Sequence, residues 1–160
     1  MTPNGNILIV DGYGQIYRSF YAIRGLTNPH GEPINALYGV ARFLLALDRD
    51  QPHEFGAVAL DKGRPTEPLE ILPTYKATRP PMPDDLRSQL EPIRQWIDAA
   101  GWPILQQQGI EADDLIAAVV TAREGHQTYI VSHDKDLGQL VDQTGVFQLV
   151  PGNKGSLLKL

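Results

Sequence analysis

Apolar and polar positions along this 160-residue chain fall into two repeating patterns. Three apolar, partly β-branched runs each end on an aspartate: NILIVD at Asp11, FGAVALD at Asp61 and TYIVSHD at Asp134. These runs predict buried strands, and PILQQ predicts a further short strand over 103–107. Apolar positions at helical spacing predict helices over 15–21, 36–47, 85–99 and 113–123. Strands that alternate with helices indicate an α/β fold with a parallel sheet.

The length of the chain allows one ordinary hydrophobic core, so we expect a single domain over residues 1–160. A long proline-rich excursion at about 62–84 leaves the sheet edge, and loops of this length are usually functional or disordered. The final stretch, VFQLVPGNKGSLLKL, predicts a last strand and a turn. The sequence contains neither a membrane-length apolar run nor a secretory signal, so we expect a soluble, cytoplasmic protein.

Carboxylates are concentrated where the predicted strands end. The carboxyl ends of parallel strands share one edge of a sheet, where ligands bind. The stretch GIEADDLIAA begins a helix at the same edge, and SHDKDL adds an acidic pair. Acidic residues in a first helical turn are also common without any ligand, because the helix dipole stabilises them by roughly 0.3–1 kcal/mol. The candidate ligands are Asp11, Asp61, Glu111, Asp113, Asp114, Asp134 and Asp136.

Seven negative charges at one edge destabilise a fold unless a cation lies among them. Cysteine is absent, so oxygen ligands are the abundant candidates, and Mg²⁺ or Mn²⁺ fits them best. The net charge of −5 disfavours a nucleic-acid partner, but without these seven residues 12 acidic groups face 14 Lys and Arg. The TYKATRPP stretch offers Lys76 and Arg79 for phosphates and Tyr75 for base stacking, or it is a solvated basic loop.

Together these stretches resemble the 5′-nuclease domain of bacterial DNA polymerase I, within the flap endonuclease group and its PIN-like fold. The resemblance runs in order through ILIVDG, LTNPHGEPINALYGV, YKATRPPMPDDLR, GIEADDLIA and DKDLGQLV, and covers nearly the whole chain. It implies a three-layer, Rossmann-like parallel sheet flanked by helices, with a helical arch. It also implies a metal-dependent 5′-3′ exonuclease or flap endonuclease of replication and repair, acting on DNA with 5′ ends or flaps, with RNA as the alternative polymer.

The same resemblance implies roles for individual residues. Those matching the ligands of a first metal are Asp11, Asp61, Glu111, Asp113 and Asp114, and those toward a second metal are Asp134 and Asp136. Lys76 and Arg79 match arch residues that contact the scissile phosphate, and Tyr75 matches the aromatic residue beside them. Arg18 matches a basic residue near the active site. The two strand-end residues Asp11 and Asp61 are therefore predicted to be catalytic together with Lys76 and Arg79.

Several positions depart from the family pattern. Gly12, Tyr13 and Gly14 stand where Gly-Ser-Ser is usual, His133 replaces a glycine, and Glu67-Pro68 replaces Phe-Arg. The family also continues into a Gly-Asp-x-x-Asp-Asn segment and a helix-hairpin-helix element that are not in this sequence. The resemblance therefore implies an incomplete second metal site. It implies either a fragment, with a polymerase region following if the natural chain is longer, or a reduced homologue.

Three other functions compete with hydrolysis. A non-catalytic nuclease-like module that binds branched nucleic acid or a protein partner is favoured by His133 and the altered arch, and disfavoured by the seven carboxylates. A dinucleotide-binding motif in VDGYGQIYRS is disfavoured because Tyr17 occupies the place of the third glycine. Aspartyl phosphotransfer is disfavoured because Lys135, which directly follows Asp134, is poorly placed to serve a nucleophilic carboxylate.

Overall fold

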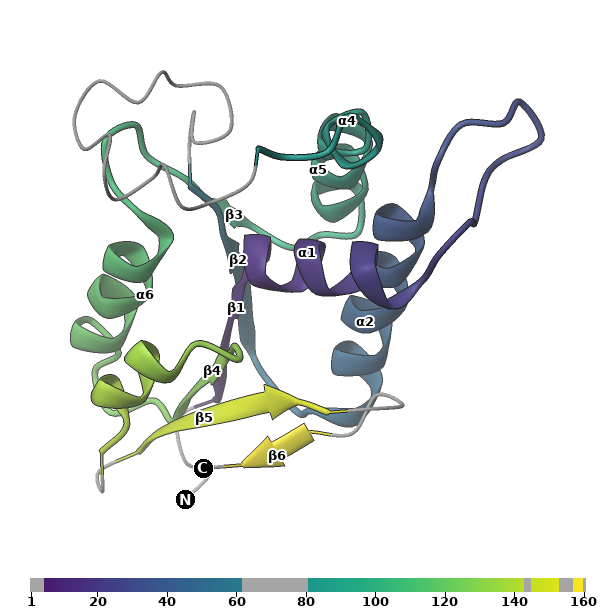
Figure 1. Ribbon diagram of the computed structural model, residues 1–160. Coiled ribbons are helices and arrows are strands. Elements are labelled where there is room, and N and C mark those ends of the chain that lie inside the picture. The colour runs from purple at the N-terminus through teal and green to yellow at the C-terminus, as the bar shows by residue number, and fades with distance from the viewer. Residues whose placement is uncertain (1–4, 62–80, 143–144, 153–156, 160) are drawn as a thin grey trace.

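A computed structural model describes residues 5–61, 81–142, 145–152 and 157–159 of the chain. Its sheet has the strand order β3-β2-β1-β4-β5-β6 (Figure 1). The first five strands are parallel, and β6 pairs antiparallel to β5. The strands are β1 (Ile7–Asp11), β2 (Phe55–Ala59), β3 (Ile104–Leu105), β4 (Thr128–Val131), β5 (Val146–Pro151) and β6 (Leu157–Lys159). The α/β fold with a parallel sheet is thus confirmed, and β6 extends the predicted final strand and turn.

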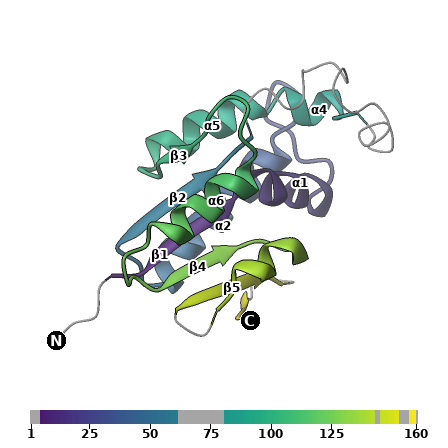
Figure 2. The same ribbon diagram turned by 90° about the vertical axis from the view of Figure 1, so that its left-hand side faces the viewer.

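The helices lie on both faces of the sheet and give three layers (Figures 1 and 2). One face is covered by α1 (Gly12–Ala22), α2 (Asn35–Asp50), α4 (Asp84–Arg87) and α5 (Leu90–Ala99). The other face is covered by α6 (Ala112–Thr121) and a 3₁₀ helix, η1 (Lys135–Leu140). Among the described residues, none of these helices is long and apolar enough to cross a membrane.

Alternating side chains of β1 divide the interior into two cores. Leu8 and Val10 pack with the α1, α2 and α5 layer, whereas Ile9 packs with the α6 and η1 layer. This is the period of two that a strand buried on both faces must show. β1 also pairs with β2 on one side and β4 on the other, so the chain order reverses at its carboxyl end. Open α/β sheets bind ligands at such a reversal point.

The predicted helix over 85–99 is divided into α4 and α5, which corrects the sequence interpretation. Pro92 lacks an N–H, and in a continuous helix its ring would clash with the carbonyl of Ser88. The chain therefore turns at residues 88 and 89 and begins a new helix at Leu90. Pro92 then lies in the first turn of α5, where its missing donor has no intrahelical partner.

The break also directs the side chain of Gln89 inward, where it is 2% exposed. Its Oε1 accepts from Leu37 N at 3.0 Å in the first turn of α2, and its Nε2 donates to Asn35 Oδ1 at 2.7 Å. Asn35 Nδ2 in turn donates to the carbonyls of Phe20 and Ile23 at the end of α1, at 2.8 and 2.7 Å. This polar network joins α1, α2 and α5, and it satisfies helix-end groups that would otherwise be buried without partners.

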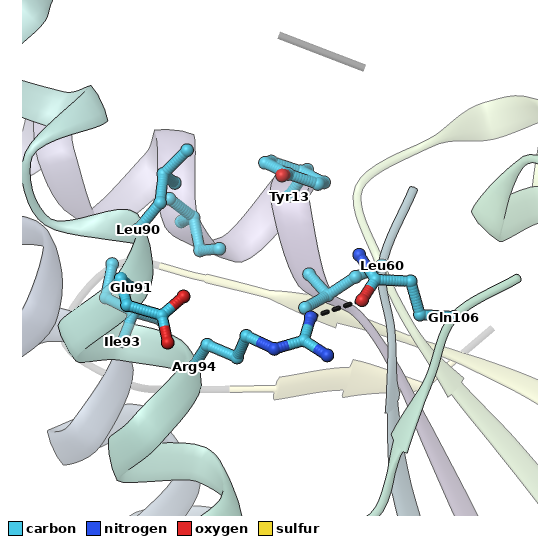
Figure 3. A pocket seen from close by; sticks show the side chains of 8 residues that line it. Tyr13, Leu60, Leu90, Glu91, Ile93, Arg94 and Gln106 are labelled. Atoms are coloured by element: carbon cyan, nitrogen blue, oxygen red, sulfur yellow. Dashed lines mark hydrogen bonds between the residues drawn. The ribbon is translucent and has the colours of Figure 1, made fainter. Parts of the chain in front are cut away.

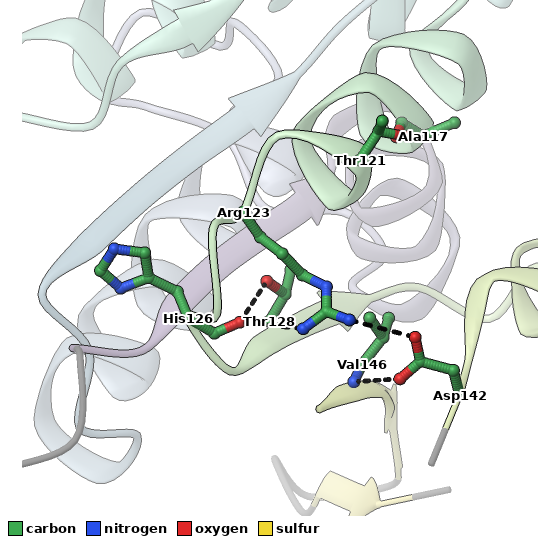
Figure 4. Close-up of polar contacts among 7 residues, drawn as sticks. All are labelled: Ala117, Thr121, Arg123, His126, Thr128, Asp142 and Val146. Atoms are coloured by element: carbon green, nitrogen blue, oxygen red, sulfur yellow. Dashed lines mark hydrogen bonds and ion pairs between the residues drawn. The ribbon is translucent and has the colours of Figure 1, made fainter. Parts of the chain in front are cut away.

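Polar contacts at the amino ends of the strands have a structural role (Figure 4). Arg123, beyond the end of α6, donates to Asp142 Oδ2 at 3.2 Å and to the carbonyl of His126 at 3.5 Å. Asp142 Oδ1 accepts from Val146 N at 3.0 Å. These contacts join the end of α6 to the beginning of β5, at the opposite edge of the sheet from the predicted site.

Candidate active site

Asp11 is the last residue of β1 and the N-cap of α1. Its side chain accepts from Gly14 N at 3.4 Å and from Ser132 Oγ, beyond β4, at 2.8 Å. A Cβ at position 14 would lie 2.7 Å from Asp11 Oδ2, so glycine leaves the room that this carboxylate occupies. The departure from the family pattern at Gly14 is therefore compatible with a carboxylate at the end of β1.

Asp61 lies two residues beyond β2 and is 7% exposed. Its Oδ1 accepts from Ala112 N, the first residue of α6, at 2.6 Å. The carboxylate thus satisfies a backbone donor at a helix start that belongs to another segment of the chain, where the helix dipole favours negative charge. This contact explains how a carboxylate is tolerated in the interior and fixes α6 against the end of β2.

Ser132 connects the carboxylates at the ends of β1 and β4. Its hydroxyl donates to Asp11 and accepts from Asp134 N at 3.0 Å. Asp134 is the N-cap of η1, and its Oδ1 accepts from Asp136 N at 2.9 Å. The buried Gln148 of β5 donates to the carbonyls of both Ser132 and Asp134 at 2.9 Å.

Sequence reasoning missed the positioning roles of Ser132 and Gln148. Gln148 interrupts the apolar strand VFQLV, and a polar residue in a buried strand has to find hydrogen-bond partners. That interruption was the available signal. The role of Ser132 gave no such signal, because it depends on a contact between residues 121 positions apart.

The start of α6 separates its three carboxylates. Glu111 is the N-cap and is exposed, and it makes no capping hydrogen bond with its side chain. Asp113 is partly buried, whereas Asp114 is exposed. Successive residues of a helix are rotated by about 100°, so adjacent aspartates cannot face the same way. Asp136 of η1 is likewise exposed.

Electrostatic interactions show which carboxylates are neighbours. Burial raises the pKa of Asp113 from 3.8 to about 6, aided by the negative charges of Asp134, Asp11, Asp61 and Glu111 in that order. Burial also raises the pKa of Asp11, as do the charges of Asp134 and Asp61. The hydrogen bonds from Ser132 and Gly14 lower this pKa and offset part of the increase. The structure therefore brings five of the seven predicted ligands together: Asp11, Asp61, Glu111, Asp113 and Asp134.

Arg18 and His133 form a pair beside this cluster. Arg18 Nη1 lies 2.8 Å from His133 Nε2, and Arg18 Nη2 donates to the carbonyl of Gly152 at 3.1 Å. Burial lowers the pKa of His133, as does the positive charge of Arg18, while a hydrogen bond with the carbonyl of Pro151 acts in the opposite direction. The neutral imidazole accepts from Arg18 in this arrangement, which gives the histidine at the family's glycine position a partner.

The basic residues predicted for the arch, Lys76 and Arg79, lie outside the described residues, as do Tyr75 and the altered pair at 67 and 68. The described part of the predicted arch region therefore consists of residues 81–84, which lead into α4. The contribution of the arch to the site stays a prediction.

The five neighbouring carboxylates fit a divalent cation in their donor chemistry and in their charge. Hard cations take oxygen ligands, and a cation would offset the burial and the repulsion that raise the pKa values of Asp11 and Asp113. Within the described ranges, however, no three carboxylate or imidazole side chains are placed closely enough to share one ion. The arrangement is a negatively charged cluster whose side chains have to rotate or move to complete a coordination shell.

Residues 6–157 match the family described as 5′-3′ exonuclease, N-terminal resolvase-like domain. The chain belongs to this family. DNA polymerase I of Pseudomonas aeruginosa is 41% identical over 154 residues, which are 95% of this chain and 17% of that protein. The 5′-3′ exonuclease of Aquifex aeolicus is 37% identical over 139 residues, which are 86% of this chain and 48% of that protein. The chain thus spans less than half of the family relatives it matches here.

Two solved structures share the fold of this chain. T5 5′-exonuclease with bound divalent metal ions (zinc) superposes with a TM-score of 0.65 at 21% identity, covering 96% of this chain and 57% of that one. A T5 flap endonuclease in a complex with DNA and metal ions superposes with a TM-score of 0.56 at 19% identity, covering 91% of this chain and 54% of that one. The predicted family resemblance and three-layer fold are both confirmed.

Proposed function

We propose that this chain is a nuclease core that hydrolyses phosphodiester bonds near the 5′ ends of DNA, as a 5′-3′ exonuclease or a 5′-flap endonuclease. The observation that carries the proposal is the cluster of five carboxylates at the reversal point of the sheet. Burial and the charges of neighbouring carboxylates raise the pKa values of Asp11 and Asp113, so keeping these two side chains ionised costs stability that a scaffold without a ligand has no reason to bear. Family membership supports the same reaction class.

We assign the divalent metal, Mg²⁺ or Mn²⁺, to Asp11, Asp61, Glu111, Asp113 and Asp134, with Asp114 and Asp136 completing the set after side-chain movement. When bound, such a cation would supply activation of a water molecule and stabilisation of the charge that develops on the phosphate oxygens. The scaffold residues have separate tasks: Ser132 orients Asp11, and Gln148 holds the loop that carries Asp134. The second metal site is proposed to be incomplete in this chain.

Basic residues are proposed to hold the substrate. Arg18 lies beside the cluster and would contact a DNA phosphate, with Lys76, Arg79 and Tyr75 contributing from the arch at about 62–84. Phosphate contacts of this kind position nucleic acid without reading its sequence. The proposed organisation is one nuclease domain over 1–160, with DNA as the partner and RNA as the alternative polymer.

The pairing of Arg18 with His133 and Gly152 favours a second candidate function. An arginine held by two protein partners has fewer donors left for a phosphate. Together with carboxylates that are too far apart to share an ion, this supports a module that binds branched nucleic acid or a protein partner without hydrolysis.

Cleavage of a 5′-labelled flap DNA across a Mg²⁺ and Mn²⁺ titration tests the proposal. The comparison is with Asp134→Asn, which keeps an N-cap side chain for η1 but removes the charge. Asp98→Asn, an exposed change on α5, is the control for a general loss of one acidic residue. Metal-dependent cleavage that disappears only in Asp134→Asn supports hydrolysis. Tight DNA binding without cleavage at any metal concentration supports the second candidate instead.

A further inference from the structure

A cavity of about 150 Å³ lies between α1, the end of β2, α5 and the end of β3 (Figure 3). Its apolar wall is formed by Ile16, Leu60, Leu90 and Ile93. A single buried water needs only about 10–15 Å³, and drug-sized ligands occupy pockets of about 300 Å³ or more. A cavity of about 150 Å³ has room for one six-membered aromatic ring.

The remaining lining residues suit a flat, polar-edged ring. Tyr13 contributes an aromatic side chain and Arg94 a guanidinium, and both kinds of group stack on nucleobases. Glu91 supplies a hydrogen-bond acceptor, and Gln106 supplies an amide. Arg94 donates to Gln106, which holds these two side chains together on one side of the cavity. The carboxylate of Glu91 disfavours a phosphate in this position, whereas it can accept from an amino or imino group at a base edge.

The cavity is connected to the proposed site through the chain. Tyr13 follows Asp11 by two residues in the first turn of α1, and Leu60 directly precedes Asp61. Gln106 Nε2 donates to the carbonyl of Asp61 at 3.0 Å, so the polar wall of the cavity is bonded to the strand end that carries a carboxylate. A nucleotide whose phosphate lies at the carboxylates would therefore have its base next to this cavity.

We propose that the cavity binds one unpaired pyrimidine base of the DNA, adjacent to the phosphate held at the carboxylate cluster. This inference rests on the proposed function for the presence of DNA. It adds a base subsite in which Tyr13 and Arg94 provide the stacking faces. Since every base has such a face, the subsite selects an unpaired nucleotide rather than a long sequence.

Binding of flap DNA tests the subsite separately from hydrolysis. We would measure Kd in Ca²⁺ for flap DNAs in which single thymines in the flap and at the junction are replaced, one at a time, by abasic residues. In the unaltered protein, removing the base at one position of the flap DNA should raise Kd about tenfold. Removing the base at any other position should raise Kd less than about twofold. The variants are Tyr13→Ala, which removes a stacking face, and Leu90→Phe, which fills the cavity.

Both variants should reduce the effect of the abasic residue at that position to less than about twofold. Tyr21→Ala is the matched control, because Tyr21 is an exposed aromatic residue of the same helix outside the cavity, and it should keep the tenfold effect. Thermal unfolding shows whether each variant is folded. The effect of the abasic residue on Kd is then judged only in the variants that are folded. An equal effect at all positions, or a tenfold effect that persists in a folded Tyr13→Ala or Leu90→Phe, overturns the subsite.

Cleavage in Mg²⁺ is scored on the same DNAs as a separate result. Binding with the predicted base dependence but without cleavage overturns the hydrolytic proposal and supports the subsite. Cleavage without any base dependence supports the hydrolytic proposal and overturns the subsite. Absence of binding to every flap DNA overturns both.

Discussion

Replacing Asp113 by asparagine should make the metal-free protein more stable at neutral pH. The folded state holds the pKa of this carboxyl at about 6, whereas the unfolded chain returns it to 3.8. Between these values the folded state binds more protons than the unfolded state, so stability falls as pH rises through this window. The loss of stability caused by ionised Asp113 is absent below about pH 4 and complete above about pH 6.

The magnitude follows from the two pKa values. Their difference corresponds to about 3 kcal/mol for a fully buried group. Asp113 is partly exposed, and solvent screening lowers this to about 1–2 kcal/mol. Asparagine keeps the shape and removes the charge. Asp113→Asn should therefore raise the melting temperature by about 2–8 °C at pH 7.5 in a chelator, and by almost nothing at pH 4.

Divalent metal should reverse the order of stability. If Asp113 is a ligand, Mg²⁺ at about 100 times its Kd adds about 2.7 kcal/mol to the original protein and less to Asp113→Asn. Urea unfolding from pH 4 to 8, with chelator and with Mg²⁺, gives the free energies of unfolding, and thermal unfolding gives the melting temperatures. Asp98→Asn serves as the control, with changes within about 0.5 kcal/mol. A less stable Asp113→Asn in chelator at pH 7.5, or an equal response of both proteins to Mg²⁺, would refute the reasoning.

Two further substitutions separate scaffold from site. Gln89→Ala leaves the part-buried N–H of Leu37 and the buried side-chain oxygen of Asn35 without their partner, so urea unfolding should show a loss of about 2–3 kcal/mol. The exposed Gln95→Ala should show almost no change, and equal losses in the two variants would contradict the network. Asp11→Asn keeps the shape of the side chain and removes one negative charge beside Asp134 and Asp61, so Mg²⁺ affinity measured by calorimetry should fall; unchanged affinity would count against Asp11 as a ligand.

The sequence was sufficient to predict the parallel sheet and the edge on which the site lies. β1, β2 and β4 are short apolar runs that end at or near an aspartate, and parallel pairing places their carboxyl ends together. The same pattern could not predict how far each carboxylate points into the cluster. Asp113 and Asp114 are neighbours in sequence, yet the rotation of the helix buries one partly and exposes the other.

The contacts that position the cluster could not be predicted from the sequence, for a different reason. Ser132 is one hydroxyl among many in the sequence, and its role depends on β1 and β4 being adjacent, which places Asp11 beside it. The break before α5 was predictable in principle, because Pro92 stood inside the predicted helix. The effect of the break was not predictable, because Gln89 forms a hydrogen bond with a helix more than 50 positions away in the sequence.

The scaffold contacts explain how a fold tolerates carboxylates that repel one another. Asp61 accepts from Ala112 N, Asp11 from Ser132 and Gly14, and Asp134 from Asp136 N. A hydrogen bond to a charged group contributes about 1.5–3 kcal/mol, which is comparable with the cost of keeping Asp113 ionised in the folded state. Each of these three aspartates therefore accepts at least one hydrogen bond, whereas burial and neighbouring negative charges raise the pKa of Asp113 to about 6, so a nearby positive charge stabilises its ionised form. On this basis, charge removal at position 113 separates the metal requirement from the folding requirement more cleanly than the same change at Asp61.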